Sequence, residues 1–288
     1  MPGSNIRALE KARSLAADSL ILDLEDSVSP EAKTMARINV VAALAAGGYG
    51  FREVVIRING LASPWGFDDL VAAASCGADA VLVPKVESAD GIRQVDAALK
   101  RLDAPEQLAI WAMMETPLAM LRAEEIAGAS PRLACLVMGT SDLAKDLHAS
   151  HTRDRLPMIT SLGLCLLAAR GHGLAILDGV HLDLQDDAGF EDACRQGVEL
   201  GFDGKTLIHP KTLDAANRAF APSPEEVEWS CKIIAAFQAA LAEGKALVVC
   251  DGKLIENLHV ENAKRVVALS EAIAARAGAD PARAAAAT

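Results

Sequence analysis

The chain has 288 residues and a formal net charge of −11 at pH 7; 51% of its residues are hydrophobic and only 3% are aromatic. This length suits one large α/β domain, or a barrel with an appendage. The low aromatic content argues against an all-β sandwich and an aromatic nucleic-acid platform, and the negative charge argues against general polyanion binding. We therefore expect no nucleic-acid partner.

The cysteines and the apolar segments indicate the compartment. Six cysteines, at positions 76, 135, 165, 194, 231 and 250, are scattered and form no CxxC pair, as expected of free thiols in a reducing environment. No apolar segment approaches the ~20 residues of a membrane span, and the N-terminus lacks the pattern of a signal peptide. We expect a cytoplasmic protein without membrane contact.

Short apolar runs alternate with helical patterns along the first 221 residues. The opening Met1–Ser4 resembles a strand-to-helix turn whose strand is missing, and it precedes a helix predicted over 6–17. Short apolar runs that are bounded by turn residues are typical of buried parallel strands. They lie at residues 19–24, 53–58, 80–83, 108–114, 133–138, 174–177 and 204–208.

Seven such strands, with an eighth implied ahead of Pro2, predict a (β/α)8 TIM barrel over residues 1–221. Either the native start lies upstream of Met1 or the first strand is abbreviated. No GxGxxG turn supports a Rossmann half.

The pattern changes at Pro222. Residues 222–288 predict a helix to about 243, a hairpin around Asp251-Gly252 and a helix over 260–277. Because this helix–hairpin–helix extension is small, we expect it to pack on the barrel or on a neighbouring subunit. Residues 278–288 are Ala-rich and predict a frayed tail.

Two carboxylates follow successive predicted strands, Glu115 after 108–114 and Asp142 after 133–138. Chemistry in α/β folds gathers at the carboxyl ends of strands, and Mg²⁺ binds one or two carboxylates and retains water or substrate ligands. The sequence therefore predicts a Mg²⁺ site, with Mn²⁺ as a substitute. The competing interpretation is that the two carboxylates cap the helices that follow them.

Three other strand-end residues have two interpretations each. Arg57 can grip a substrate carboxylate or pair with Glu25 or Asp26. Lys85 can form a Schiff base or an ion pair. His209 can act as a base or anchor a loop, and we favour the anchor.

The sequence resembles the citrate lyase β-subunit-like branch of the aldolase/citrate lyase family, the CoA-ester lyases. Matching segments include PGSNIRALEKA (2–12), ILDLEDSVSPEAKTMAR (21–37), VVIRING (54–60), AVLVPKVESADGI (80–92), METP (114–117), GTSDLAKDL (139–147), GFDGKTLIHPKTL (201–213) and DGKLIENLHVENAKRV (251–266). They occur in the family's order and cover nearly the whole chain. The resemblance implies a Mg²⁺-dependent TIM barrel that acts on CoA thioesters as a homo-oligomer, a trimer or hexamer.

The resemblance also implies residue roles. Glu115 and Asp142 become metal ligands, Arg57 an oxyanion or carboxylate clamp, and Glu25 and Asp26 catalytic-site residues near a metal-bound water. Glu256 stands where relatives carry a catalytic Asp that reaches a neighbour's active site. The glutamate side chain is one methylene longer than that aspartate. The remaining implied residues are Lys85, Gly139, Thr140 and Ser141 for the substrate, and Arg13, Lys33, Arg37 and His209 for CoA.

The predicted reaction is cleavage or formation of a C–C bond in a malyl-CoA- or citramalyl-CoA-type thioester, giving acyl-CoA and a 2-oxo acid. The metal would stabilise the hydroxyl oxygen, and a base would take the hydroxyl proton. Arg57 would stabilise the enolate that forms. Three alternatives remain open: a hydroxyacyl-CoA thioesterase on the same scaffold, a 2-oxo-acid aldolase without CoA, and an acyl-CoA-binding subunit without activity.

Overall fold

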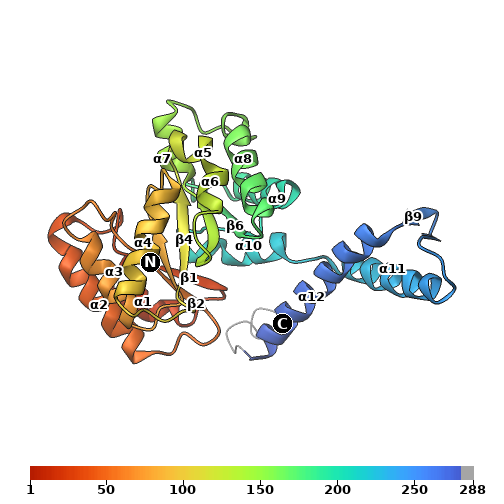
Figure 1. The fold of residues 1–288 in the computed structure, drawn as a ribbon, viewed down its shortest axis with the longest axis horizontal. Helices are drawn as coiled ribbons and strands as arrows, with labels where there is room; N and C mark the ends of the chain where they lie inside the picture. Colours follow the sequence, from red (N-terminus) through yellow and green to blue (C-terminus); the bar gives the residue numbers. More distant parts are fainter. Residues whose placement is uncertain (280–288) are drawn as a thin grey trace. The chain divides into compact units, whose positions relative to one another are not determined.

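The structure, a computed structural model, describes residues 1–279 and divides into two compact units. The first unit, Met1–Ala216, contains a seven-stranded parallel sheet in the order β1-β2-β3-β4-β5-β6-β7 (Figure 1). Its strands are β1 (Ser19–Asp23), β2 (Glu53–Arg57), β3 (Ala80–Val83), β4 (Ala109–Met114), β5 (Leu133–Met138), β6 (Ala175–Asp178) and β7 (Gly204–Lys205). The α/β class and the parallel sheet are confirmed.

Helices connect these strands. They are α1 (Ile6–Ala12), α2 (Lys33–Ala46), α3 (Gly66–Ser75), α4 (Ala89–Arg101), α5 (Pro117–Leu121), α6 (Ala123–Ala127), α7 (Thr140–Asp146), α8 (Ile159–Gly171), α9 (Asp187–Leu200) and α10 (Leu213–Phe220), with 3₁₀ turns at Pro30–Ala32, Leu156–Met158 and Pro210–Thr212. Several begin at residues whose side chains accept a backbone N–H, such as Ser88 before α4 and Thr116 before α5.

The sheet curls around an apolar interior. Val55, Trp111 and Val137 form a buried cluster with Ala80, Leu82 and Cys135, and both Ile21 of β1 and Leu177 of β6 pack against it. Strands from both sides of the sheet therefore meet the same interior, as in a TIM-barrel-like fold. Alternate residues of β4, such as Ile110 and Met114, are fully buried outside this cluster. Burial on both faces explains why these strands are continuous apolar runs.

The predicted eighth strand is reduced to a single parallel bridge between Pro2 and Asp23. The Gly3 N–H donates to the Asp23 carbonyl, and the Asp23 N–H donates to the Met1 carbonyl, both at 2.8 Å. The described sheet therefore has the seven strands that the sequence predicts, and the implied first strand is represented by this bridge alone.

Two predicted boundaries were too long. Helix α1 ends at Ala12 rather than 17, because the N–H groups of Ser14 and Leu15 bond to carbonyls three residues back and tighten the chain into turns. Strand β7 ends at Lys205 rather than 208, where the Thr206 hydroxyl and N–H both turn to the Asp178 carbonyl.

The second unit begins at Asn217. It contains α11 (Pro224–Ala242), an antiparallel hairpin of β8 (Val248–Cys250) and β9 (Lys253–Ile255), and α12 (Asn257–Ala279). Its apolar core joins Ile233 and Phe237 of α11 to the hairpin and to Val260 of α12. A capping box between Ser223 and Glu226 begins α11. The last residues of the predicted tail, 280–288, lie outside the described residues.

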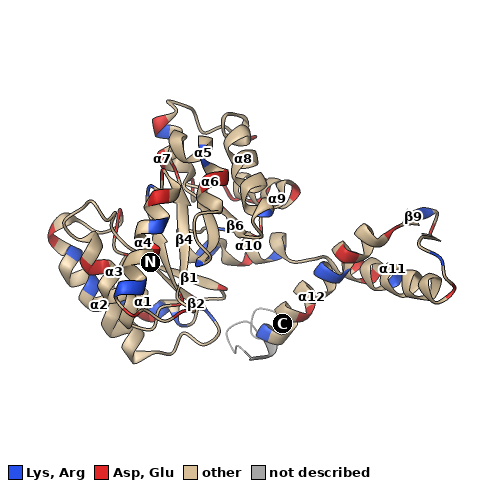
Figure 2. Ribbon diagram, in the orientation of Figure 1, with Lys and Arg blue, Asp and Glu red and all other residues tan. Residues whose placement is uncertain are grey.

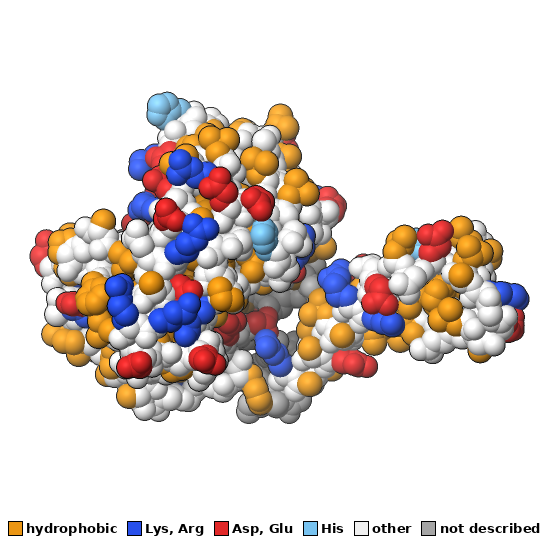
Figure 3. All heavy atoms as spheres, in the orientation of Figure 1, with side chains coloured by type: hydrophobic (Ala, Val, Ile, Leu, Met, Phe, Trp, Pro, Cys, Tyr) orange, Lys and Arg blue, Asp and Glu red, His pale blue; other side chains and the backbone are white. Residues whose placement is uncertain are grey.

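Charged side chains are distributed over the helices of both units (Figure 2). On the face drawn in Figure 3, acidic and basic side chains are interspersed with apolar ones. Within the described part of the chain, no helix is both long and apolar enough to cross a membrane. All six cysteines are free.

Candidate functional site

The ends of β1 and β2 hold the first part of the site, an ion pair that the sequence analysis missed. Asp23 and Arg57 are directly opposite each other in the parallel register. The Nε and Nη2 atoms of Arg57 each donate to an oxygen of Asp23 at 2.6 Å. Burial alone would raise the pKa of Asp23, but the Arg57 hydrogen bonds and charge lower it to about 2. An acid inside the apolar run ILDL was the available signal, since a buried charge requires a partner.

The third nitrogen of Arg57 faces two other acids. Its Nη1 atom lies 3.2 Å from Glu25 and 3.7 Å from Asp26. The ion-pair interpretation of Arg57 therefore holds in this structure. The side chain is 15% exposed, so the guanidinium is largely buried at the strand ends.

Lys85 joins the same cluster from the end of β3. Its Nζ atom lies 3.2 Å from Glu25 and 3.8 Å from Asp26. Partial burial would lower the pKa of Lys85, but Glu25 outweighs it and the pKa is raised. Burial is also the largest cause of the raised pKa of Glu25. A protonated Lys85 favours the ion-pair interpretation over the Schiff base, which needs a neutral amine.

Glu115 is held in place by backbone on two sides. The Lys85 N–H donates to Oε1 of Glu115 at 2.8 Å, and Lys85 has a left-handed backbone, with φ of 48°. Gly139 approaches from β5 so closely that a Cβ there would lie 2.6 Å from Oε2 of Glu115. Glycine is therefore required at position 139 for the Glu115 carboxylate to occupy this position.

Glu115 lacks compensating charge. It is 2% exposed, and burial, with smaller contributions from Asp142 and Glu25, raises its pKa to about 7. Thr116, not Glu115, caps the following helix α5, so the capping interpretation fails for Glu115. A buried carboxylate beside a second carboxylate is stabilised by a cation.

The donors around Glu115 and Asp142 fit a small divalent cation. Ser141, between Gly139 and Asp142, has a buried hydroxyl oxygen without a hydrogen-bond partner. Within residues 1–279, no group of three or more His, Cys, Asp or Glu side chains is arranged to hold a metal. Two carboxylates that leave other positions for water or substrate match Mg²⁺ or Mn²⁺ rather than a cation caged by protein ligands.

The four residues implied for CoA binding are not brought together. Lys33 is buried, and its Nζ donates to the carbonyls of Leu24 and Glu25 at 3.0 and 2.7 Å. Arg37 pairs with Asp68 and Asp69 on α3. These contacts hold α2 against β1 and α3, and both Lys33 and Arg37 also contact Trp65. Their role in CoA binding stays a prediction.

Arg13 and His209 lie in different environments. Arg13 packs over the Tyr49 ring at 5.3 Å and donates to the Ala43 carbonyl, close to the chain entering β2. It therefore lies at the amino end of the sheet, away from the carboxylates. His209 follows β7 at the carboxyl end, where its Nδ1 accepts the Lys211 N–H and caps a 3₁₀ turn. This contact is the loop anchor that we favoured.

A second charged cluster lies at the ends of β6 and β7. The Asp178 side chain is fully buried and accepts hydrogen bonds from Arg155 at 2.7 Å and Lys205 at 2.9 Å. Burial lowers the pKa of Lys205, despite the opposing charge of Asp178. Asp178 directly follows the predicted strand 174–177, and no role was predicted for it.

Glu256 belongs to the second unit. It follows β9 and precedes α12, where its N–H donates to Nδ1 of His259 and its carbonyl accepts the His259 N–H, each at 3.0 Å. These contacts involve only the backbone of Glu256, so the catalytic role of its side chain stays a prediction.

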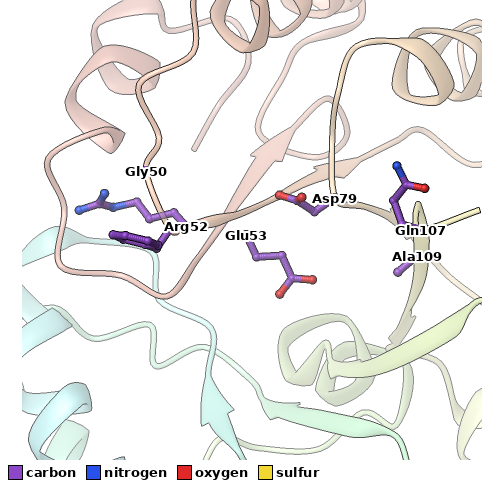
Figure 4. A pocket seen from close by; sticks show the side chains of 7 residues that line it. Gly50, Arg52, Glu53, Asp79, Gln107 and Ala109 are labelled. Carbon is purple, nitrogen blue, oxygen red and sulfur yellow. The ribbon is translucent and has the colours of Figure 1, made fainter. Parts of the chain in front are cut away.

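A pocket at the opposite end of the sheet contains none of these residues (Figure 4). It is lined by Gly50, Phe51, Arg52, Glu53, Asp79, Gln107 and Ala109, at the amino ends of β2, β3 and β4. Arg57, Lys85, Glu115 and Asp142 instead lie at the carboxyl ends of their strands, where the chemistry of such folds is found.

Comparison with known proteins places these residues in context. Residues 1–210 match the model of the HpcH/HpaI aldolase/citrate lyase family. The chain is 50% identical over 275 residues to a (3S)-malyl-CoA thioesterase of Cereibacter sphaeroides, covering 96% of this chain and 94% of that protein. It is 33% identical over 276 residues to citrate lyase subunit beta of Escherichia coli, covering 94% and 91%.

A solved structure agrees with the fold. CitE of Mycobacterium tuberculosis, in complex with magnesium, acetoacetate and coenzyme A, superposes with a TM-score of 0.77 at 26% identity, covering 94% of this chain and 96% of that chain. The comparisons contradict the carbon–carbon lyase that we predicted as the main activity, because the relatives at 50% identity are named thioesterases. The chain belongs to the HpcH/HpaI aldolase/citrate lyase family.

Proposed function

We propose that this protein is a Mg²⁺-dependent thioesterase that hydrolyses a malyl-CoA-type thioester to free CoA and the hydroxy acid. The observation that carries this proposal is 50% identity, over 96% of the chain, to a protein named (3S)-malyl-CoA thioesterase. Identity to citrate lyase subunit beta is 33% over a similar span. The thioesterase and the lyase use the same scaffold, so sequence distance is the main discriminator.

Glu115 and Asp142 would hold the metal. Support comes from the raised pKa of Glu115 and from the magnesium in the CitE complex. Bound there, Mg²⁺ supplies Lewis-acid stabilisation of negative charge on oxygen. The Lys85 N–H holds one oxygen of Glu115 by a hydrogen bond, and the close approach of Gly139 places β5 against the other. The metal-facing carboxylate is thus oriented by backbone atoms.

Hydrolysis needs a water nucleophile, a base and a cationic site for the oxyanion. Water adds to the thioester carbonyl, a base accepts its proton, and the C–S bond breaks to release the CoA thiol. Arg57 Nη1 and Lys85 Nζ are the cationic donors of the first cluster, and we assign them to the oxyanion or the acyl carboxylate. Gly139, Thr140 and Ser141 complete the proposed substrate side.

Glu256 is the proposed base, supplied by the second unit of a neighbouring subunit in a homo-oligomer. Glu25 and Asp26 have a different role in this proposal, because both contact Arg57 and Lys85. They set the charge and position of the two cations. For CoA, we retain His209 at the carboxyl end of the sheet.

The test is incubation of the purified protein with (3S)-malyl-CoA, with and without Mg²⁺. Free thiol and malate are measured beside acetyl-CoA and glyoxylate in the same samples. Mg²⁺-dependent thiol and malate in equal amounts are expected. Glyoxylate and acetyl-CoA without free thiol would refute hydrolysis.

A further inference from the structure

The buried cluster of Asp178, Lys205 and Arg155 has no part in the chemistry above, yet it lies at the catalytic end of the sheet. Asp178 and Lys205 are paired in register at the ends of β6 and β7. Their side chains are 0% and 1% exposed. Asp178 also accepts the Gly179 N–H at 2.8 Å, so its two oxygens accept four hydrogen bonds from three donor groups.

This cluster is not explained by stability alone. It buries two cations with a single anion, and the Nη2 atom of Arg155 is buried without a hydrogen-bond partner. Desolvation of buried charges usually offsets most of their attraction, so well-packed apolar residues would serve as well. Arg155 also has a left-handed backbone, with φ of 54°. Strain and buried charge at the carboxyl ends of strands indicate a functional constraint.

A chain of contacts links the cluster to the metal ligands. Lys205 donates to the Gly179 carbonyl as well as to Asp178. Gly179 packs directly on the end of β5, because a Cβ there would lie 2.4 Å from the Thr140 hydroxyl oxygen and 3.0 Å from the Met138 carbonyl. Thr140 is buried and is the first residue of α7, which carries Asp142.

We propose that Asp178 is a positioning residue that holds Gly179, through Lys205, against Thr140 and so fixes the metal-ligating geometry of Asp142 and Glu115. The inference rests on the metal site of the proposed function. Arg155 contributes by tying Asp178 to α9, since its Nε donates to Gln196. The cluster is thus the rigid support against which the β5–α7 turn is seated.

Three variants test this proposal. Asp178→Asn keeps the side-chain shape and removes the anion. Gly179→Ala leaves every charge in place and brings a methyl group against Thr140. It therefore tests the same contact if Asp178→Asn fails to fold. Asp96→Asn is the matched control. Asp96 is likewise buried, accepts hydrogen bonds from Lys100 and Ser130 and forms an ion pair with Arg132, but it lies on α4 and faces the chain entering β5.

The measurement is the Mn²⁺ dissociation constant of the full chain by electron paramagnetic resonance, with thermal unfolding recorded on each sample. Asp178→Asn and Gly179→Ala are expected to weaken Mn²⁺ binding about 10–100-fold, the range for residues that orient metal ligands. Asp96→Asn is expected to lower the unfolding temperature without changing Mn²⁺ affinity. Adding Thr140→Ala to Gly179→Ala removes the two closest contact atoms and should recover part of the affinity.

Wild-type Mn²⁺ affinity in folded Gly179→Ala would overturn the proposal. An equal loss in Asp96→Asn would also overturn it, by showing that affinity only follows stability. Absence of Mn²⁺ binding by the wild-type protein would remove its basis. Free-thiol release from malyl-CoA by the wild-type protein tests the proposed hydrolysis separately, so positioning can hold even if hydrolysis fails.

Discussion

Two charged clusters share the carboxyl end of the sheet, and they differ in how their charges balance. Around β1 to β5, the acids outnumber Arg57 and Lys85, and Glu115 has a pKa of about 7. At β6 and β7, the cations outnumber Asp178, whose oxygens are fully bonded. A deficit of positive charge in a buried site indicates where a cation binds, whereas a buried acid whose oxygens are fully bonded indicates support.

The largest effect should come from removing a carboxylate of the first cluster. Asp142→Asn is expected to abolish Mg²⁺-dependent thiol release, because one of two proposed metal ligands loses its charge. Steady-state assays across Mg²⁺ concentrations measure this. Asp146→Asn, on the same helix but at an exposed position, is the control. Undiminished turnover in Asp142→Asn would show that the first cluster does not depend on a metal bound by Asp142.

Glu256 tests whether the first cluster needs a base from outside it. Glu256→Gln should reduce the rate by about 10²–10⁴-fold, the usual contribution of general acid–base catalysis. Single-turnover kinetics with saturating Mg²⁺ separate this loss from substrate binding. Glu261→Gln, which alters an exposed ion pair on the helix α12 that follows Glu256, should be near wild type. A near wild-type rate for Glu256→Gln would instead leave Glu256 a structural role.

Asp23 gives a pH-dependent stability effect. Its pKa falls from 3.8 to about 2 on folding, so its ionised form stabilises the folded state above pH 3.8. Asp23→Asn should cost about 2 kcal/mol at neutral pH, and this difference should disappear as the pH falls from about 4 to about 2. Denaturant unfolding of both proteins over this pH range measures it. A pH-independent difference would mean that packing, not charge, makes the contribution.

The smallest effect concerns the backbone of Lys85. Lys85→Gly and Lys85→Ala both lose the ion pair with Glu25, so their difference reports only the left-handed conformation. The glycine variant should be more stable by about 1 kcal/mol, because residues with a Cβ are strained there. Equal unfolding free energies would show that the loop relaxes around position 85.

Elements were more predictable from sequence than contacts. The bounds of β3 and β5 agree with the predicted 80–83 and 133–138, because each apolar run is bracketed by polar or turn residues. Lys33 could not be placed in this way, since nothing in its local pattern shows that its amine folds back onto the Leu24 carbonyl. The partnership of Asp23 with Arg57 depends on strand register, which two isolated runs do not specify.

The sequence motifs could not distinguish a lyase from a thioesterase. The roles proposed for Glu115, Asp142 and Arg57 would serve either reaction, because both require a Lewis acid and a cationic site for an oxyanion. The two reactions differ in what lies in line with the base: a water molecule for hydrolysis, or a carbon–carbon bond of the substrate for the lyase. That depends on the shape of the acyl site, which these three residues do not define.

The bonding of the strand-end lysines has a consequence for self-modification. A thioester acylates any neutral amine that reaches it, so an enzyme that holds one risks aminolysis by its own side chains. Lys33 and Lys205 are buried against carbonyl oxygens, and the ion pairs of Lys85 raise its pKa and keep it an ammonium without a free lone pair. In the proposed hydrolysis, the same contacts that build the carboxyl end of the sheet would leave water as the competent nucleophile.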